Sequence, residues 1–172
     1  MANQEQDSNY ELKTEVVTIN RTALVKRGGR RFSFTAVVIV GDQKSRIGMG
    51  IGKAKEVSLA VQKAVGEAKK NMISIHLQKG TIHHPIRSKY GASIVYMAPA
   101  STGTGVIAGG AMRAVFDCLG VENILAKRYR SSNPINVARA TIKGLQEMDS
   151  IATVARRRGV SKEKVIGTEA AK

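Results

Sequence analysis

The chain has 172 residues, and its 28 lysine and arginine residues against 13 aspartate and glutamate residues give a formal charge of +15. A protein this basic usually neutralises an anionic partner; nucleic acid is the first candidate and a membrane surface is the rival. The sequence has no long uncharged apolar run, which excludes a transmembrane helix, and its single cysteine, Cys118, excludes an internal disulfide framework and suits a reducing compartment.

The N-terminal part of the chain is predicted to form a polar tail followed by a β-hairpin. Residues 1–11 are polar and acidic, which predicts disorder and is typical of neither a signal peptide nor a transit peptide. Strands are predicted at 14–24 and 32–40, and the run 26–31 between them places Gly28-Gly29 among four basic residues, a hairpin signal. Such a tip favours contact with nucleic acid over a merely solvated loop.

A glycine-rich strand follows the turn predicted at Gly41-Asp42. Residues 46–52 alternate apolar side chains with Gly48, Gly50 and Gly52, and a period of two predicts a strand with its apolar set on the core face. Three glycines on the other face indicate that something approaches the backbone closely there. Two interpretations remain open: a polyphosphate backbone lies against this bare face, or the strand packs under its own helix.

Two enzyme signatures fail on spacing around these glycines. A Walker A loop would need its first glycine at Ile47 and its hydroxyl at Ala54, and a dinucleotide fingerprint would need its third glycine at Lys53. A nucleotide-dependent enzyme that uses the glycine loops is therefore the weaker alternative. It would require saturable nucleotide binding by the isolated protein.

Residues 54–72 are predicted to form an amphipathic helix. Its apolar residues recur at spacings of three and four, and its opposite face carries Lys55, Lys63, Lys69 and Lys70. The segment 16–55 before it holds nine basic residues and one acid, Asp42. This excess again favours a polyphosphate partner.

The remainder of the chain is predicted to form a second unit. Strands are expected at 73–77, 93–98 and 122–129, and helices at 108–119, ending at Gly120, and from Asn133-Pro134 to Met148. This order indicates an α+β or split β-α-β arrangement. We therefore expect an α+β protein with a tail at 1–11, domains at 12–73 and 74–150, and a basic tail at 151–172.

No catalytic or metal-binding constellation is recognisable. His76, His83, His84 and Cys118 lack metal-ligand spacing, the acids form no general acid/base pair, and the Ser-x-x-Lys pattern at 161–164 lies in the tail. We therefore expect no metal, no cofactor and no enzymatic activity. The loop Gly103-Thr104-Gly105 with Gly109-Gly110 is typical either of an anion-binding helix N-terminus or of a loop crossing close to a packed helix.

Taken in order over about residues 14–160, several segments resemble the bacterial family of the fifth small-subunit ribosomal protein. The most specific are Lys26-Arg27-Gly28-Gly29-Arg30-Arg31-Phe32-Ser33-Phe34, Gly48-Met49-Gly50-Ile51-Gly52-Lys53-Ala54-Lys55, Gly103-Thr104-Gly105-Val106-Ile107-Ala108-Gly109-Gly110 and Asn133-Pro134-Ile135-Asn136-Val137. The chain departs from the family pattern at Gln43-Lys44-Ser45, at Ser58 where proline is common, and at Arg130 where glycine is usual.

The resemblance implies a fold and a function. The implied fold is an N-terminal double-stranded-RNA-binding-like domain of three antiparallel strands plus a helix, lacking the first helix of such modules, and a C-terminal split β-α-β domain with a left-handed crossover. The family is a structural part of the small ribosomal subunit in the cytoplasm. It binds small-subunit rRNA, contacts small-subunit proteins four and eight, lies near the mRNA entrance and influences decoding accuracy, with no membrane partner. Its hairpin loop lies beside the site of spectinomycin, an antibiotic that blocks translocation.

Charge pattern and resemblance together lead us to expect two kinds of contact. Backbone neutralisation and shape recognition should dominate rRNA binding, with little base reading, because aromatic residues are few. A free regulatory RNA-binding protein outside the ribosome is the remaining alternative. Protein contacts are expected at Gly103, Thr104, Gly105 and Arg113. Contacts with rRNA are expected at Arg21, Lys26, Arg27, Gly28, Gly29, Arg30, Arg31, Lys44, Arg46, Gly48, Gly50, Gly52, Lys53, Lys55, Lys69, Lys70, Lys127 and Asn133.

Overall fold

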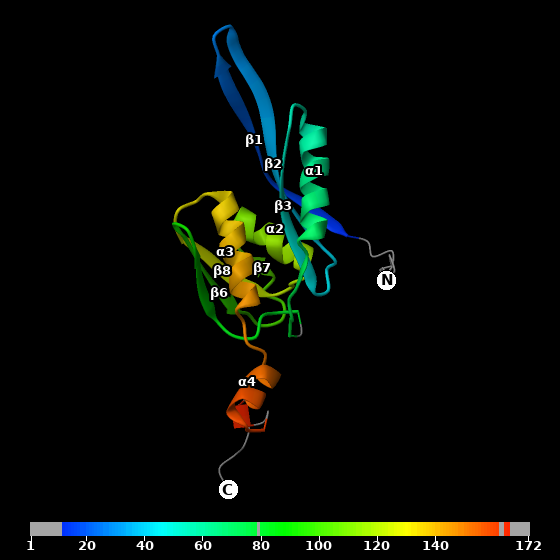
Figure 1. Cartoon of the computed structure of the whole chain (residues 1–172). Helices are drawn as coiled ribbons and strands as arrows, with labels where there is room; N and C mark the ends of the chain where they lie inside the picture. Colours follow the sequence, from blue (N-terminus) through cyan, green and yellow to red (C-terminus); the bar gives the residue numbers. More distant parts are fainter. Residues whose placement is uncertain (1–11, 79, 162–163, 166–172) are drawn as a thin grey trace, which may run out of the picture.

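The computed structural model describes residues 12–78, 80–161 and 164–165. The predicted tail 1–11 and most of the chain end after Ser161 lie outside these residues. The described residues form two four-stranded sheets and four helices. Their arrangement is that of an α+β protein, as predicted (Figure 1). The first sheet has the order β1-β2-β3-β4 and the second the order β5-β6-β8-β7.

The first unit contains a long hairpin, a third strand and a helix. Its elements are β1 (Lys13–Lys26), β2 (Gly29–Gly41), β3 (Arg46–Ala54) and α1 (Val57–Lys70). β3 pairs with β2 only as far as the Phe34–Ala54 partners, whereas β1 and β2 remain paired up to Lys26 and Gly29. The hairpin therefore projects beyond the rest of the sheet, as Figure 1 shows.

Helix α1 packs directly on the three glycines of β3. A Cβ atom added at Gly50 would lie 2.0 Å from the carbonyl oxygen of Ala64, and those at Gly48 and Gly52 would lie equally close to helix carbonyls. All three glycines are buried. Strand and helix thus approach as only glycine and alanine permit. The expectation that these three glycines contact rRNA is wrong, because α1 occupies the space that the phosphates would need.

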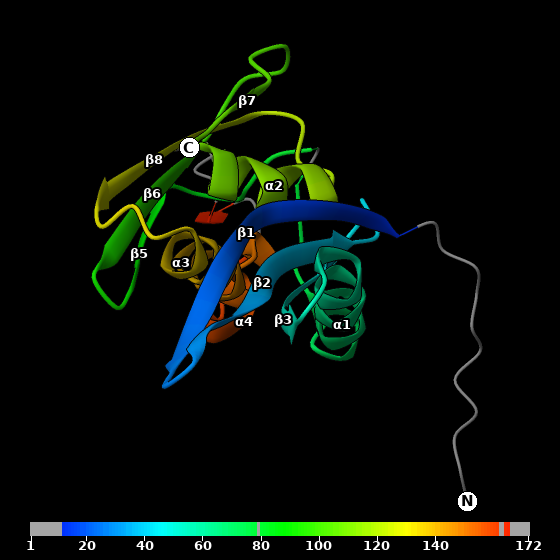
Figure 2. The same cartoon turned by 90° about the horizontal axis from the view of Figure 1, so that it is seen from above.

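The opposite face of the first sheet packs on the second unit. Ile39 and Ile47 are fully buried and share a core with Phe116 and Leu119 of α2 (Gly110–Leu119). A Cβ atom at Gly41 would lie 2.1 Å from the carbonyl oxygen of Cys118, so turn and helix end meet closely. The sheet is therefore covered on both faces, by α1 and by α2 (Figure 2).

A β-bulge at Val17 breaks the alternation that the sequence suggests for β1. The register between β1 and β2 shifts between Val16 and Thr18, and Val17 packs against the shared core. Ile19, which would share the face of Val17 in a regular strand, is 43% exposed. The extra residue re-aims the side chains on either side of it.

The second sheet comprises β5 (Ile86–Tyr90), β6 (Ser93–Pro99), β7 (Val106–Ile107) and β8 (Ile124–Arg130), with α2 and α3 (Pro134–Gln146). β7 and β8 are adjacent and parallel, with α2 between them in the chain. No strand is inserted between them, so the β-α-β unit is direct and the predicted split form is wrong.

Two predicted helix ends are confirmed. Oδ1 of Asn133 accepts a hydrogen bond from the N–H of Ile135 at the start of α3, and Gly120 ends α2 at φ 82°.

Four elements differ from the prediction, and one of them is the short strand β7, which was not predicted. The strand expected at 73–77 is only β4 (Ile73–Ser74), and it pairs with β3 of the first sheet. Strand β5 was not predicted, because Arg87 and Lys89 left it without an apolar pattern. The basic tail contains helix α4 (Ile151–Arg158), capped by Ser150 and ended by Gly159 at φ 64°. These cap signals were present in the sequence, but the arginines hid the periodicity.

Two non-glycine residues take the left-handed conformation. Gln43 has φ 54° and Arg130 has φ 61°. Both positions are among those at which the sequence was expected to depart from the family pattern, with glycine expected in place of Arg130. The backbone keeps the conformation that glycine would adopt there, and the arginine accepts strain of about 1 kcal/mol.

Candidate nucleic-acid interface

The hairpin tip presents four cations with no acidic neighbour. Lys26, Arg27, Arg30 and Arg31 are exposed, and none of them forms an ion pair within the described part of the chain. Gly29 has φ 137°, which an L side chain rarely adopts, whereas Gly28 is outside the positive-φ range and open space surrounds it. The chain reversal thus depends on Gly29. We call Lys26–Arg31 the hairpin tip.

Below the tip, a cation–π contact orients a further arginine. The guanidinium carbon of Arg21 lies 3.7 Å from the ring centroid of Phe32, across the strand pair. Such a stack holds the planar guanidinium in one orientation and leaves its N–H groups available to an anion. Lys53 and Lys55 are exposed near the base of the same hairpin, since Ala54 pairs with Phe34.

A second basic group lies at the opposite end of the first sheet. Lys44 lies in the turn before β3 and Arg46 is the first residue of that strand, whereas Lys69 and Lys70 lie in the last turn of α1. The two groups are neighbours, because the helix packs on Gly48 through Ala68. The structure therefore places the cations of the first unit that are predicted to bind rRNA at two ends of the sheet. The sequence had suggested one site, formed by the bare glycine face and the lysines of the helix that follows it.

Asp42 organises the turn that carries this second group. Its Oδ1 accepts hydrogen bonds from the N–H groups of Lys44, Ser45 and Arg46 at 3.0, 2.8 and 2.8 Å. Partial burial alone would raise the pKa of this carboxyl, but the N–H groups outweigh burial and hold the pKa below its usual value. The one acid of the segment 16–55 therefore shapes the backbone of the turn.

Two remaining residues predicted to bind rRNA lie in the second unit. Lys127 is exposed on β8. Asn133 is exposed at the start of α3, where its side-chain oxygen is engaged in capping the helix. Neither lies in the first sheet with the hairpin tip, so the structure does not bring all predicted rRNA-binding residues together.

Asn123, which the sequence analysis missed, holds the loop predicted to contact protein. Its side chain is 6% exposed, and Oδ1 accepts hydrogen bonds from the N–H groups of Gly103 and Gly105 at 3.0 and 3.1 Å. Gly103 and Gly105 have φ values of 93° and 73°. A buried amide that fixes two backbone N–H groups gives the loop one defined shape.

The loop glycines do not serve close packing. An added Cβ atom at Gly103, Gly105, Gly109 or Gly110 would meet nothing within 4 Å, so the interpretation as a loop crossing near a packed helix is wrong. Arg113 is exposed on α2, and its guanidinium lies 3.9 Å from the carboxylate of Asp117 on the same helix. Loop and arginine are thus both accessible to a partner.

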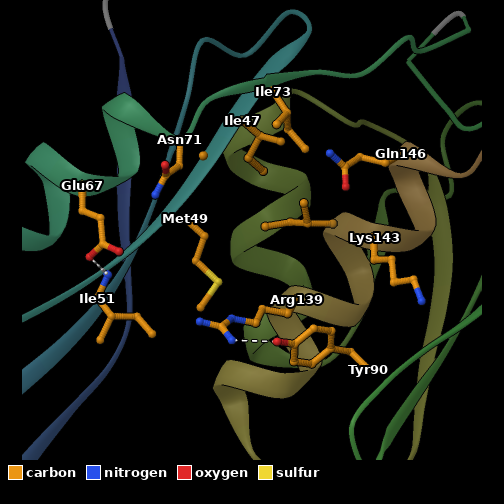
Figure 3. A pocket seen from close by; sticks show the side chains of 12 residues that line it. Ile47, Met49, Ile51, Glu67, Asn71, Ile73, Tyr90, Arg139, Lys143 and Gln146 are labelled. Atoms are coloured by element: carbon orange, nitrogen blue, oxygen red, sulfur yellow. Dashed lines mark hydrogen bonds between the residues drawn. The ribbon is translucent and has the colours of Figure 1, made fainter.

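A cleft of about 410 Å³ lies between the two units, beside their shared core (Figure 3). Met49 and Ile51 of β3 lie on one side, and Arg139 and Tyr90 on the other. Nη1 of Arg139 donates to the hydroxyl of Tyr90 at 2.8 Å. Among the described lining residues the one carboxylate is Glu67, which accepts from the N–H of Ile51 at 2.9 Å. Arg139, Tyr90 and Glu67 are each engaged in one of these two hydrogen bonds. Among the described lining residues we therefore recognise no general acid/base pair.

The thiol and the imidazoles form no metal centre within the described residues. No three histidine, cysteine, aspartate or glutamate side chains gather there. Burial raises the pKa of the Cys118 thiol to about 12, so the thiol stays neutral. Burial also lowers the pKa of His83, whose Nδ1 lies 3.1 Å from Oε1 of Gln78. Across the described residues, every helix is too short or too polar to cross a bilayer.

Comparison with known proteins identifies the relatives of this chain. Residues 12–76 match the N-terminal domain of ribosomal protein S5, and residues 88–158 match its C-terminal domain. The small ribosomal subunit protein uS5 of Marinobacter nauticus is 53% identical over 157 residues, which cover 91% of this chain and 95% of that protein. The uS5 protein of Shewanella amazonensis is 50% identical, and the match covers 94% of this chain and 96% of that protein. The uS5 protein of Chromohalobacter salexigens is also 50% identical, and the match covers 97% of this chain and 100% of that protein.

Proposed function

The chain belongs to the ribosomal protein S5 family, and from this premise we propose that the hairpin tip holds it on the RNA of the small ribosomal subunit. The protein is a structural constituent of that subunit that binds rRNA, located in the ribosome in the cytoplasm, and it is not an enzyme. The observation that supports the role of the tip is its four exposed cations, which form no ion pair with any residue that the structure describes, on two strands that extend beyond the core.

The mode of binding follows from the chemistry of these groups. Arginine forks bridge phosphate oxygens in a fixed orientation, and a tight reversal at Gly29 lets the tip enter between RNA backbones. We infer that the tip recognises backbone and shape, and that the second basic group, at Lys44, Arg46, Lys69 and Lys70, contacts another stretch of rRNA. Through these contacts the protein supports subunit assembly.

The test of the tip is Gly28→Asp. Because an added Cβ would meet nothing within 4 Å and Gly28 needs no positive φ, we expect the melting temperature to change by less than about 2 °C. The added carboxylate would repel phosphates and shift the tip. The family resemblance implies that this loop lies beside the spectinomycin site, so we expect ribosomes that carry the variant to be less sensitive to spectinomycin. The variant should still be incorporated normally into small subunits and stay bound to them during sedimentation in high salt.

Gly28→Ala is the matched control, because it adds a side chain without charge and should leave drug sensitivity unchanged. Unchanged sensitivity of normally incorporated Gly28→Asp would contradict the placement of the tip. A large loss of stability would instead mean that Gly28 belongs to the fold.

We further propose that the loop Gly103–Gly105 and Arg113 face small-subunit protein four, and that small-subunit protein eight is another neighbour of the chain. The loop is suited to this because Asn123 gives it one shape and its glycines leave its backbone open. The backbone of the loop would then contact the partner closely, and Arg113 would pair with an acid of the partner across the interface. The protein would then influence decoding accuracy near the mRNA entrance.

Arg113→Glu tests this contact. Reversing the charge should weaken binding of small-subunit protein four by about tenfold or more and change misreading in a stop-codon readthrough assay, while rRNA affinity falls less than about threefold. Arg113→Ala is the control, because it removes the positive charge without placing a second acid beside Asp117. If rRNA binding collapsed instead, the loop would belong to the RNA interface.

We also infer finer relationships of the two units. The unit 12–73, a sheet with one helix on a single face, is related to double-stranded-RNA-binding modules that lack their first helix. The unit 74–150 carries its β7-α2-β8 connection as a left-handed crossover, an exception to the usual handedness. The segment 151–172 forms a basic extension beyond it.

A further inference from the structure

The outer face of the second sheet gathers two tyrosines among cations. Cross-strand partners in a sheet point to the same face. Tyr96 on β6 is the partner of Arg87 on β5 and of Lys127 on β8, which places the three side chains in one row. The next row is Lys89, Ile94 and Tyr129.

This face lies opposite the core and is accessible. Val95 and Met97 of β6 belong to the core cluster, whereas Ile94 belongs to neither cluster, so the alternate positions of the strand point outward. Tyr96 is 39% exposed and Tyr129 is 48% exposed, although both are large side chains. Ile94, at 8% exposure, forms an apolar floor among these neighbours.

The charge of the face is wholly positive. Arg87, Lys89 and Lys127 are exposed, and the other outward positions in these rows are tyrosine or isoleucine, so no acid neutralises them. A basic groove with aromatic side chains is typical of proteins that bind single-stranded nucleic acid. Charge complementarity therefore favours a polyphosphate with accessible bases.

We propose that this face binds a single-stranded stretch of RNA by stacking bases on Tyr96 and Tyr129, while Arg87, Lys89 and Lys127 contact its phosphates. The proposal rests on the proposed function only in taking RNA as the ligand. The tyrosines are related by a cross-strand diagonal, about 7–8 Å in an antiparallel pair, which suits two successive splayed bases. RNA-recognition sheets stack two or three bases in a similar layout.

A third outward row indicates where the single strand would leave the face. Leu125 on β8 and Ile107 on β7 are 42% and 54% exposed and are cross-strand partners. This apolar edge offers no phosphate contact. The RNA would therefore run over β5, β6 and the C-terminal half of β8, where all three cations lie.

The test uses the full-length chain and two labelled RNAs, an oligouridylate and a duplex of about 16 base pairs. Tyr96→Leu and Tyr129→Leu should each reduce affinity for oligouridylate about tenfold in fluorescence anisotropy, and affinity for the duplex less than twofold. Tyr96→Phe and Tyr129→Phe should retain affinity, because the ring is kept. Ultraviolet crosslinking of oligouridylate should label Tyr96 and Tyr129.

Tyr90→Leu is the matched control, because Tyr90 belongs to the same sheet but points into the cleft beside Arg139 (Figure 3). It should leave oligouridylate affinity unchanged. Replacing the four cations of the hairpin tip by alanine should have the opposite selectivity, with duplex affinity lowered on the order of a hundredfold and the tyrosine crosslinks kept. These variants therefore distinguish a wrong assignment of the hairpin tip from a wrong assignment of this face.

Two results would overturn the proposal. One is unchanged oligouridylate affinity in both leucine variants, each shown to be folded by circular dichroism. The other is equal loss on both RNAs, which would indicate a general change of fold. In either case the exposed tyrosines would instead fit a protein partner.

Discussion

Gly50→Ala is expected to destabilise the protein by about 3 kcal/mol or more, although it adds a single methyl group. The methyl carbon would lie 2.0 Å from the carbonyl oxygen of Ala64 and 2.5 Å from the N–H nitrogen of Ala68. Both are backbone atoms of α1, so no side-chain rotation relieves the clash, and the helix must move off the sheet. The midpoint of urea unfolding measures the loss.

Gly66→Ala is the matched control on the same helix. Gly66 is exposed, and an added Cβ atom would meet nothing within 4 Å. Alanine in a helix interior is favoured over glycine, so this variant should gain about 0.5–1 kcal/mol. Equal stability of Gly50→Ala and the wild type would refute the close approach of α1 to β3.

Removal of the tip charges should have the largest effect on RNA binding. With about six phosphate contacts, the wild-type affinity should fall roughly a thousandfold between 50 and 200 mM salt. Replacing Lys26, Arg27, Arg30 and Arg31 by alanine should lower duplex affinity on the order of a hundredfold at the lower salt concentration. The slope of log affinity against log salt should become shallower by about 3 to 4, since each lost contact releases one fewer counterion.

The control removes four cations that already have acidic neighbours. Lys13, Arg113, Lys143 and Arg157 lie within 4.0 Å of Glu15, Asp117, Glu147 and Asp149 respectively. Their replacement by alanine changes the net charge by the same amount but should alter the slope by less than about 1. Equal slopes for the two quadruple variants would mean that net charge, and not the hairpin tip, controls binding.

The sequence by itself determined the class of partner, the family and most elements. The nine-to-one excess of basic residues over 16–55 indicates a polyphosphate, and this follows from composition without a fold. Local signals were equally sufficient for the hairpin at Gly28-Gly29, for the end of α2 at Gly120 and for the start of α3 at Asn133. Such signals act through hydrogen bonds and φ values within a few residues, which a sequence displays directly.

Only the tertiary structure decided what covers each face. Alternation in β3 shows that Gly48, Gly50 and Gly52 share a side, but a phosphate chain and α1 satisfy that pattern equally, and the structure places α1 there. Likewise Tyr96 and Tyr129 are 33 positions apart and look isolated, until strand pairing brings β6 and β8 together. The physical reason is that periodicity defines a face, whereas its occupant comes from a distant segment whose approach depends on packing of the whole chain.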